Sequence, residues 1–427
     1  MKKLFTAIST LCFTALAWAG ANDLTFTQLF SIDTSTPNPP SYFVGADMRS
    51  CAVFENNLFI ANKSGLVHVL DATTGEYIRD LDNTGIWGGD ITLSDIKCLE
   101  DGTVVASNCR VTVSDAGTLK VYYWDDLEAA PKELINYGVD KLTPPNGNAK
   151  IHVRAFDYIG TIELGNYYAI TSDCAIDNVY VIKIPVTNGT PGDPVFYSVG
   201  GCASTTSARI RVDADESGFW FTNKGESYYY TFDSTSSWKY YNQTGNKKYT
   251  NAFEQFSIGN TPYYATVDYL DGSIGTITNP LVSIYTYESW GRWGSSGKTL
   301  VSSQPESGLV SSARNINFFD GLAIRTLTNN EKAIYMVSPL SGIAAFTVKD
   351  PTVEPTAIEG NRVESAKVYA MNGQIVVETT AGETIEIYSI TGQLITKAVA
   401  ENGITTLDAG KGVAIVKVGN KAHKVIL

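Results

Sequence analysis

The stretch CAVFENNLFIANKSG, residues 51–65, decides the expected fold because its pattern recurs along the chain. It consists of an apolar run, a polar turn at Glu55 to Asn57, a second apolar run and a polar end, which is the signature of a β-hairpin. A further β run follows each copy. The other copies are IKCLEDGTVVASNC (96–109), IELGNYYAITSDC (162–174), IRVDADESGFWFTNKG (210–225), FEQFSIGNTPYYATVDY (253–269) and LTNNEKAIYMVS (327–338).

Matching residues within the copies support a true repeat, since Asn62-Lys63 in the first copy corresponds to Asn223-Lys224 in a later one. Four short strands per unit, repeated about six times at a spacing of roughly fifty residues, predict an all-β fold of the β-propeller type. We expect six blades, with seven as the alternative number and a stack of sandwich domains as the alternative architecture. The period-two patterning and the Gly-rich turns exclude a helical solenoid.

The two ends of the repeat region are each incomplete. The last copy is followed by a run that ends at Phe346-Thr347-Val348, which gives only three clear strands. LTFTQLFSI, residues 24–32, is a lone β run ahead of the first copy. Because an unpaired edge strand is a liability, we expect this run to supply the missing outer strand and to join the two ends.

The composition excludes several classes of protein. Charged residues make up 18% of the 427 residues and the net charge is −12, whereas a nucleic-acid-binding protein normally presents a basic patch. A hydrophobic content of 44% with 11% aromatics can fill a large core, which argues against disorder. The 37 Gly and 24 Tyr favour strands and turns over a coiled coil.

Residues 1–19 have the pattern of a secretory signal peptide. Lys2 and Lys3 precede an apolar run over residues 4–16, and Ala17-Trp18-Ala19 forms an A-x-A cleavage site. No later stretch has the roughly eighteen uninterrupted apolar residues of a membrane span, so no transmembrane segment is expected. Removing the two lysines takes the net charge from −12 to −14. We therefore expect an exported chain in the periplasm, at the cell surface or outside the cell.

Export places the cysteines after the signal peptide in an oxidising compartment. They are Cys51, Cys98, Cys109, Cys174 and Cys202. An odd number cannot pair fully, which leaves one disulfide open, and we interpret most of these residues as small buried apolar groups. Because the sequence holds no C-x-x-C motif and no His/Cys cluster, we expect neither a metal site nor a cofactor.

A second domain is expected after the repeats. Pro351 and Pro355 break the pattern, so we divide the chain into a propeller at 20–350, a linker at 351–362 and a small C-terminal β-sandwich at 363–427. The last region holds its own duplication, in which Asn-Gly and Thr-Gly mark hairpin turns. Its two copies are AMNGQIVV (370–377) and SITGQLIT (389–396).

The end of the chain, IYSITGQLI (387–395) and then LDAGKGVAIVKVGNKAHKVIL (407–427), resembles the C-terminal sorting domains of type IX secretion cargo. Gly412, the β run after it and the lysines at 421 and 424 match the family's layout, with Ala414 where the family has Tyr. The resemblance implies export and surface display rather than catalysis, although similar domains also occur as retained β-sandwich appendages. The repeat region resembles uncharacterised secreted propeller families, which implies no particular activity.

Cations are expected to gather at one end of the repeat region. In a four-stranded antiparallel meander, the start of the first strand and the end of the second strand lie at the same end. Six cations occupy such positions: Arg49, Lys63, Arg154, Arg209, Lys224 and Arg314. A focus of positive charge in an acidic protein attracts anions, and Arg binds a carboxylate or sulfate with two hydrogen bonds. The alternative is that these cations form structural ion pairs between blades, with partners such as Asp47, Asp95, Asp157 and Asp213.

Two further residues are predicted at the same end. Trp87, in GIWGGD (85–90), lies in a Gly-rich connection, where a flat ring can stack on a sugar. His152 stands beside Arg154 in the sequence. The alternatives are that Trp87 packs between blades and that His152 is a structural residue.

These patterns predict an exported, non-catalytic binding protein that recognises a glycan or an anionic surface ligand at the mouth of the propeller. The sequence has no G-x-S-x-G, H-E-x-x-H or P-loop motif, so we assign no catalytic residue. The first alternative is a carbohydrate-active enzyme, either a glycoside hydrolase or a polysaccharide lyase, because two carboxylates that meet only in space leave no motif. The second is a scaffold that binds a protein partner. We do not expect a nucleic-acid partner.

Overall fold

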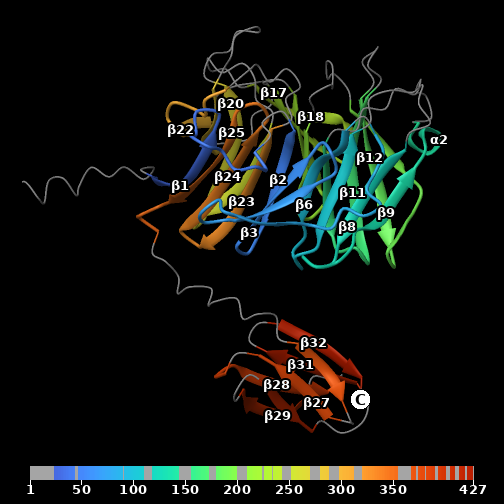
Figure 1. The fold of residues 1–427 in the computed structure, drawn as a ribbon. Coiled ribbons are helices and arrows are strands. Elements are labelled where there is room, and N and C mark those ends of the chain that lie inside the picture. The colour runs from blue at the N-terminus through green and yellow to red at the C-terminus, as the bar shows by residue number, and fades with distance from the viewer. Residues whose placement is uncertain are drawn as a thin grey trace, which may run out of the picture. The chain divides into compact units, whose positions relative to one another are not determined.

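The structure is a computed structural model, and its described residues form an all-β protein of antiparallel sheets, which confirms the expected fold class at that level (Figure 1). The chain divides into two compact units, residues 1–354 and 355–427. The described residues are 24–43, 47–89, 91–109, 118–143, 155–172, 179–199, 209–223, 226–232, 234–242, 252–269, 279–287, 298–311, 320–353, 367–371, 374–379, 381–389, 393–400, 404–408, 413–418 and 421–426. Within these ranges, no helix has the length and apolar character needed to cross a membrane.

The described residues of the first unit form six antiparallel sheets, four of which are built from consecutive strands. The first sheet contains β2(Met48–Phe54), β3(Asn57–Asn62), β4(Val67–Asp71) and β5(Tyr77–Asp80). The second contains β6(Ile91–Cys98), β7(Val104–Cys109), β8(Leu119–Trp124) and β9(Lys132–Tyr137), followed by the short helix α2(Val139–Leu142). The fourth contains β15(Arg209–Val212), β16(Gly218–Asn223), β17(Glu226–Thr231) and β18(Ser234–Asn242). The fifth contains β19(Phe253–Ile258), β20(Thr261–Tyr269), β21(Pro280–Tyr287) and β22(Lys298–Gln304).

The third and sixth sheets depart from this simple order. The third contains β10(Phe156–Gly160), β11(Leu164–Ser172), β12(Val179–Thr187), β13(Thr190–Pro191) and β14(Val195–Val199), with both β13 and β14 paired to β12. The sixth contains β23(Gly321–Thr328), β24(Glu331–Ser338) and β25(Gly342–Lys349), together with β1(Thr25–Asp33) from the start of the chain.

The strand β1 completes the sixth sheet. It runs antiparallel to β25, with Thr25 opposite Lys349 and Asp33 opposite Gly342, and so becomes the outer strand. The prediction that residues 24–32 supply the missing strand is therefore confirmed. The main-chain hydrogen bonds of this ladder therefore hold the start of the described chain to the last sheet of the unit.

Burial falls from the inner strands to the outer strand of a sheet. In the first sheet, β3 and β4 are almost entirely buried, whereas the residues of β5 are exposed or half-buried. A strand that is buried on both faces needs apolar side chains of other sheets on both sides. The inner strands of each sheet must therefore lie between neighbouring sheets.

Apolar clusters join each sheet to the next. Phe59 of the first sheet and Trp124 of the second belong to one cluster. Comparable clusters join the second sheet to the third, the third to the fourth, the fourth to the fifth and the fifth to the sixth. A further cluster, which contains Leu58 and Tyr335, joins the sixth sheet back to the first. Contacts between the described sheets therefore form a closed cycle.

Two buried carboxylates link the first strands of three successive sheets, which are β6, β10 and β15. Asp95 on β6 accepts a hydrogen bond from the Phe156 backbone N–H on β10 at 3.0 Å. Asp157 on β10 accepts one from the Val212 backbone N–H on β15 at 2.7 Å. These strands are the first of their sheets and have no ladder partner on their inner side. The carboxylates thus satisfy backbone donors that would otherwise be buried without an acceptor.

Glu216 holds the third and fourth sheets together from the turn between β15 and β16. Its carboxylate accepts hydrogen bonds from Asn166 at 2.9 and 3.0 Å, from the Tyr168 hydroxyl, and from the Lys183 ammonium at 2.8 Å. Burial raises the pKa of Glu216, but the hydrogen bonds from Lys183, Tyr168 and Asn166 outweigh it and hold this pKa below its usual value. The ionised carboxylate is therefore the form that links the two sheets.

The second unit consists of two antiparallel sheets among its described residues. One contains β26(Lys367–Met371), β27(Gln374–Glu378) and β30(Ile404–Leu407). The other contains β28(Thr384–Ser389), β29(Leu394–Val399), β31(Val413–Val418) and β32(Lys421–Ile426). Side chains from both sheets, such as Val377, Ile387 and Val416, are fully buried in one core. The unit therefore has a core of its own.

Asp157→Ala is expected to destabilise the first unit by about 3–5 kcal/mol, because it removes the acceptor of the Val212 N–H and the counter-ion of Lys97. Urea unfolding followed by tryptophan fluorescence measures this loss, since all 7 Trp precede residue 355. The matched control is Asp193→Ala. The Asp193 side chain is 91% exposed and pairs with Lys141 at the surface, so its removal should change the free energy of unfolding by at most about 0.5 kcal/mol. Equal effects of the two substitutions would contradict the linking role of Asp157.

The contribution of Glu216 to stability should depend on pH. A carboxylate whose folded pKa lies below its unfolded value stabilises the protein above the unfolded pKa, and this contribution is lost as the pH falls through the folded pKa. We therefore expect Glu216→Gln to lower the urea midpoint at pH 6.5 by more than it does below about pH 4. A midpoint difference between wild type and variant that is the same at both pH values would contradict the assignment.

Candidate functional site

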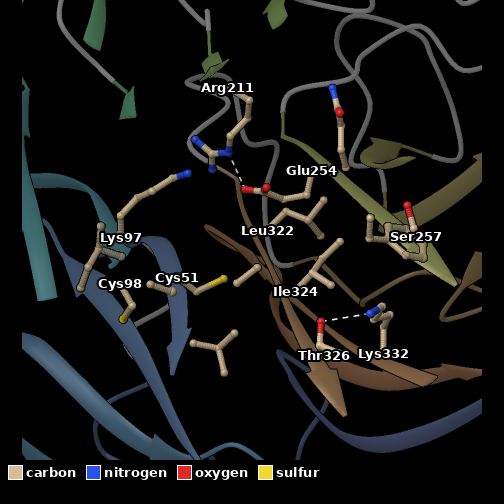
Figure 2. A pocket seen from close by; sticks show the side chains of 16 residues that line it. Cys51, Lys97, Cys98, Arg211, Glu254, Ser257, Leu322, Ile324, Thr326 and Lys332 are labelled. Carbon is tan, nitrogen blue, oxygen red and sulfur yellow. Dashed lines mark hydrogen bonds and ion pairs between the residues drawn. The ribbon is translucent and has the colours of Figure 1, made fainter. Parts of the chain in front are cut away.

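A cavity of about 280 Å³ lies against the innermost strands of five of the six sheets. Its walls come from β2, β6, β15, β19 and β23, with one further residue, Lys332, from β24 (Figure 2). Because β2, β6, β15, β19 and β23 are each an edge strand of a different sheet, the cycle of sheets brings together residues that are far apart in the sequence. The lining combines apolar residues with three cations, one carboxylate, two hydroxyls, an amide and two thiols.

The carboxylate of the cavity, Glu254, forms an ion pair with Arg211. Arg211 also donates hydrogen bonds to the carbonyl oxygens of Ile210 at 2.9 Å and Phe156 at 3.3 Å. Burial opposes its charge, but the carboxylates of Glu254, Asp157 and Asp95 outweigh this and raise the pKa of Arg211 above its ordinary value. The guanidinium is therefore a fixed positive charge at the wall of the cavity.

The two lysines of the cavity are also held by oxygen atoms. The Lys97 ammonium lies 2.5 Å from a carboxylate oxygen of Asp157. Lys332 donates to the Thr326 hydroxyl at 3.0 Å, and its side chain is 8% exposed. Figure 2 shows that Lys97, Arg211 and Lys332 reach the cavity from different strands. An ammonium group carries three N–H donors and a full positive charge, so each lysine adds a cation to the cavity wall.

The two thiols of the cavity are Cys51 on β2 and Cys98 on β6, and both are free cysteines. Burial raises the pKa of each thiol well above its ordinary value. The neutral thiol therefore dominates at physiological pH, and these side chains act as small apolar groups with weak hydrogen-bonding capacity. This agrees with the interpretation of the cysteines as buried apolar residues for Cys51, which is 3% exposed.

Two predicted site residues, Arg49 and Arg209, lie near the starts of β2 and β15 and do not line this cavity. Arg209 is 4% exposed and forms a buried ion pair with Asp95 at 3.1 Å. Arg49 is 7% exposed and donates to the Met48 carbonyl oxygen at 2.7 Å. For Arg209, the structure therefore shows the ion pair between sheets that the sequence left as the alternative.

Lys63 and Trp87 lie on the surface. Lys63 follows β3, is exposed and pairs with Asp47. The Trp87 side chain is 64% exposed and does not pack between sheets. The other predicted site residues, His152, Arg154, Lys224 and Arg314, lie outside the described residues.

The residues that line the cavity were not predicted as site residues. For Arg211 and Lys97 the sequence does hold a weak indication of position, because side chains two residues apart on a strand lie on the same face. Arg211 is two residues after Arg209, and Lys97 is two residues after Asp95, so each lies on the same strand face as a charged residue that the repeat pattern singles out. Lys332 belongs to a second strand and lies opposite Thr326 of β23, away from the strand ends at which cations were expected.

Potential metal ligands do not cluster in the part of the chain that the structure describes. These residues include no group of three or more His, Cys, Asp or Glu arranged to hold a metal ion.

Comparisons with known proteins show the fold and no activity. A family model described as a domain of unknown function (DUF6383) matches residues 355–427, the second unit. No curated protein matches the chain. Among solved structures, the chain is similar to a DUF4623 family protein from Bacteroides eggerthii, with 15% sequence identity and a TM-score of 0.57. That match covers 78% of this chain and 76% of the other, and at this identity it supports the fold alone.

Cys51 and Cys98 should react with iodoacetamide at pH 8 at least about tenfold more slowly in the folded protein than in urea, because their raised pKa values leave little thiolate. Tandem mass spectrometry of tryptic peptides locates the label, because Cys98 and Cys109 share the peptide 98–110 and only fragment ions separate them. Labelling of both at the rate of the unfolded chain would show that the cavity thiols are neither buried nor shifted in pKa.

Proposed function

We propose that the protein is an exported, non-catalytic binding protein whose cavity takes a small acidic ligand, such as a sugar acid. The observation that supports this most directly is the charge of the cavity wall. Lys97, Arg211 and Lys332 contribute three cations, whereas Glu254 and Asp157, the partner of Lys97, contribute two carboxylates. An excess of cations at the wall of a partly closed cavity favours an anion there.

The size and lining of the cavity indicate the class of ligand. A volume of about 280 Å³ lies near the lower end of the range for small-molecule sites. Ser257 and Thr326 offer hydroxyls, and Leu322 and Ile324 offer an apolar wall. A monosaccharide with a carboxylate has hydroxyls, an apolar ring face and one negative charge, and so complements all three kinds of group.

Binding explains the cavity better than glycoside cleavage. Hydrolysis of a glycosidic bond normally uses two carboxyl groups on either side of that bond. Among the described residues that line the cavity, Glu254 provides the one carboxyl group, and its carboxylate already pairs with Arg211. The second carboxylate needed for a catalytic pair is therefore missing from the described wall.

We also propose that the six sheets are the blades of a β-propeller, with the cavity in its central channel, and that the second unit is a β-sandwich. The cycle of apolar clusters and the ladder between β1 and β25 support a closed propeller. In that arrangement the first strand of each blade borders the central channel. Apart from Lys332 on β24, the residues that line the cavity belong to strands at one edge of their sheets, which are β2, β6, β15, β19 and β23.

Export and sorting complete the proposal. The Lys2-Lys3 start, the apolar run and the A-x-A motif at residues 17–19 support a secretory signal. The likeness of the chain end to type IX sorting domains supports a role for the second unit in delivering the first to the cell surface. The first unit would then carry the binding activity.

Isothermal titration with glucuronate, and with glucose as the neutral comparison, tests the ligand site. We expect glucuronate to bind more tightly than glucose. Lys332→Gln should weaken glucuronate binding about tenfold, because a hydrogen bond to a charged group contributes about 1.5–3 kcal/mol. Lys63→Gln is the matched control, since Lys63 is an exposed lysine that does not line the cavity, and it should bind glucuronate as the wild type does.

Two outcomes would overturn the proposal. Binding of neither sugar, or equal effects of Lys332→Gln and Lys63→Gln, would remove the cavity as the acidic-ligand site. Cleavage of methyl glucuronide, followed by NMR in the same samples, would replace the binding role with an enzymatic one.

A further inference from the structure

Trp87 is a large aromatic side chain that the fold leaves open to solvent. It lies in the connection between β5 of the first sheet and β6 of the second, and its side chain is 64% exposed. The neighbours Gly88 and Gly89 have no side chain to cover it. An exposed Trp loses favourable burial, so a structure that also fixes its position suggests a role outside the core.

The backbone of Trp87 is fixed by a buried hydroxyl. The Tyr122 hydroxyl donates to the Trp87 carbonyl oxygen at 2.9 Å and accepts from the Trp87 N–H at 3.2 Å. Tyr122 is 2% exposed and belongs to β8, an inner strand of the second sheet. Both polar groups of the Trp87 backbone are therefore tied to the rigid sheet rather than to the loop.

The loop conformation around Trp87 requires glycine. Gly88 has a φ of +103° and Gly89 has a φ of +76°, a region that side-chain-bearing residues rarely adopt. A Cβ on Gly88 would lie 3.5 Å from Cδ of Lys120, so the loop passes close over this lysine. The two glycines therefore allow the loop backbone that places the Trp87 ring over Lys120.

One face of the Trp87 ring covers a buried cation. The Lys120 ammonium lies 3.8 Å from the centroid of the ring, and Lys120 is 2% exposed. Its other partner is Glu133, at 2.7 Å. An ammonium over a ring face is attracted by the ring quadrupole, which fixes the tilt of the ring as well as its position. The inner face is thus occupied, and the exposed area belongs to the rest of the ring.

From this geometry we propose that the exposed face of Trp87 is a binding platform for a pyranose ring of a neutral glycan. A flat, pre-positioned aromatic face buries the apolar face of a sugar with little loss of side-chain entropy. A cationic ligand is disfavoured, because the Lys120 charge behind the ring repels it. A protein partner would need about 800 Å² of surface, whereas the described part of the connection, residues 81–89, exposes one large hydrophobic side chain, that of Trp87. This site is independent of the acidic-ligand cavity.

The test uses the full chain and the neutral hexasaccharides of cellulose, xylan, mannan and laminarin, with binding measured by isothermal titration. We expect at least one of them to bind the wild type. Trp87→Ala should weaken that binding at least about tenfold, and Trp87→Phe by less, because a smaller ring still offers a face. Lys120→Met should also weaken binding, because it removes the cation that fixes the ring.

Two controls separate this site from other effects. Tyr77→Ala removes another exposed aromatic side chain, 48% exposed on β5, and should leave binding unchanged. Lys332→Gln, in the cavity, should also leave hexasaccharide binding unchanged. Urea midpoints confirm that each variant is folded. Absence of binding by all four hexasaccharides, or wild-type affinity of a folded Trp87→Ala variant, would overturn the proposal.

Discussion

The hydrogen bonds from buried carboxylates to backbone N–H groups of the next sheet are the constraint on which the centre of the first unit depends. The first strand of each sheet has an unpaired edge, and such an edge is costly when it is buried away from water. Asp95 and Asp157 each reach across to the next first strand and satisfy one backbone donor there. Their full burial would be unfavourable for isolated charges, but Arg209 and Lys97 provide counter-ions. Removing one member of this network leaves a buried charge or donor without its partner.

The same network gives the cavity its charge. Lys97 reaches the cavity wall while it is paired with Asp157, and the carboxylates of Asp157 and Asp95 also favour the charged form of Arg211. The groups that hold the sheets together therefore also position the cations that line the cavity. Under the proposed function, one set of side chains would carry structural and ligand-binding roles, and a substitution at Asp157 would affect both. This is why the proposed test of binding uses Lys332, whose hydrogen bond to Thr326 lies within one sheet.

Much of the fold follows from local patterns, because a hairpin is specified by alternation and turn chemistry that the sequence shows directly. The pairing of residues 24–32 with the last sheet was predictable for a similar reason, since the last unit lacks one strand and the lone first strand can supply it.

The candidate site was not predictable in the same way. Arg209 and Arg211 are two residues apart, yet one pairs with Asp95 and the other borders the cavity. Which carboxylate meets which cation depends on the packing of different sheets, and strand order alone does not determine it. Trp87 was identified correctly as a loop residue at the surface, but the cation beneath its ring comes from β8 and has no local signal.

The acidic character of the chain limits how a ligand is recognised. A net charge of −12 gives a field that opposes the approach of an anion over most of the surface, so long-range steering does not favour an acidic ligand. Buried cations act over short range, where low dielectric strengthens them and salt screens them least. An acidic ligand in the cavity would therefore be recognised by direct contact with Lys97, Arg211 and Lys332. A neutral glycan on Trp87 meets no such opposing field, and its binding depends on ring contact alone. The two proposed sites thus suit ligands of different charge on one acidic protein, and each uses a cation that the fold has already fixed.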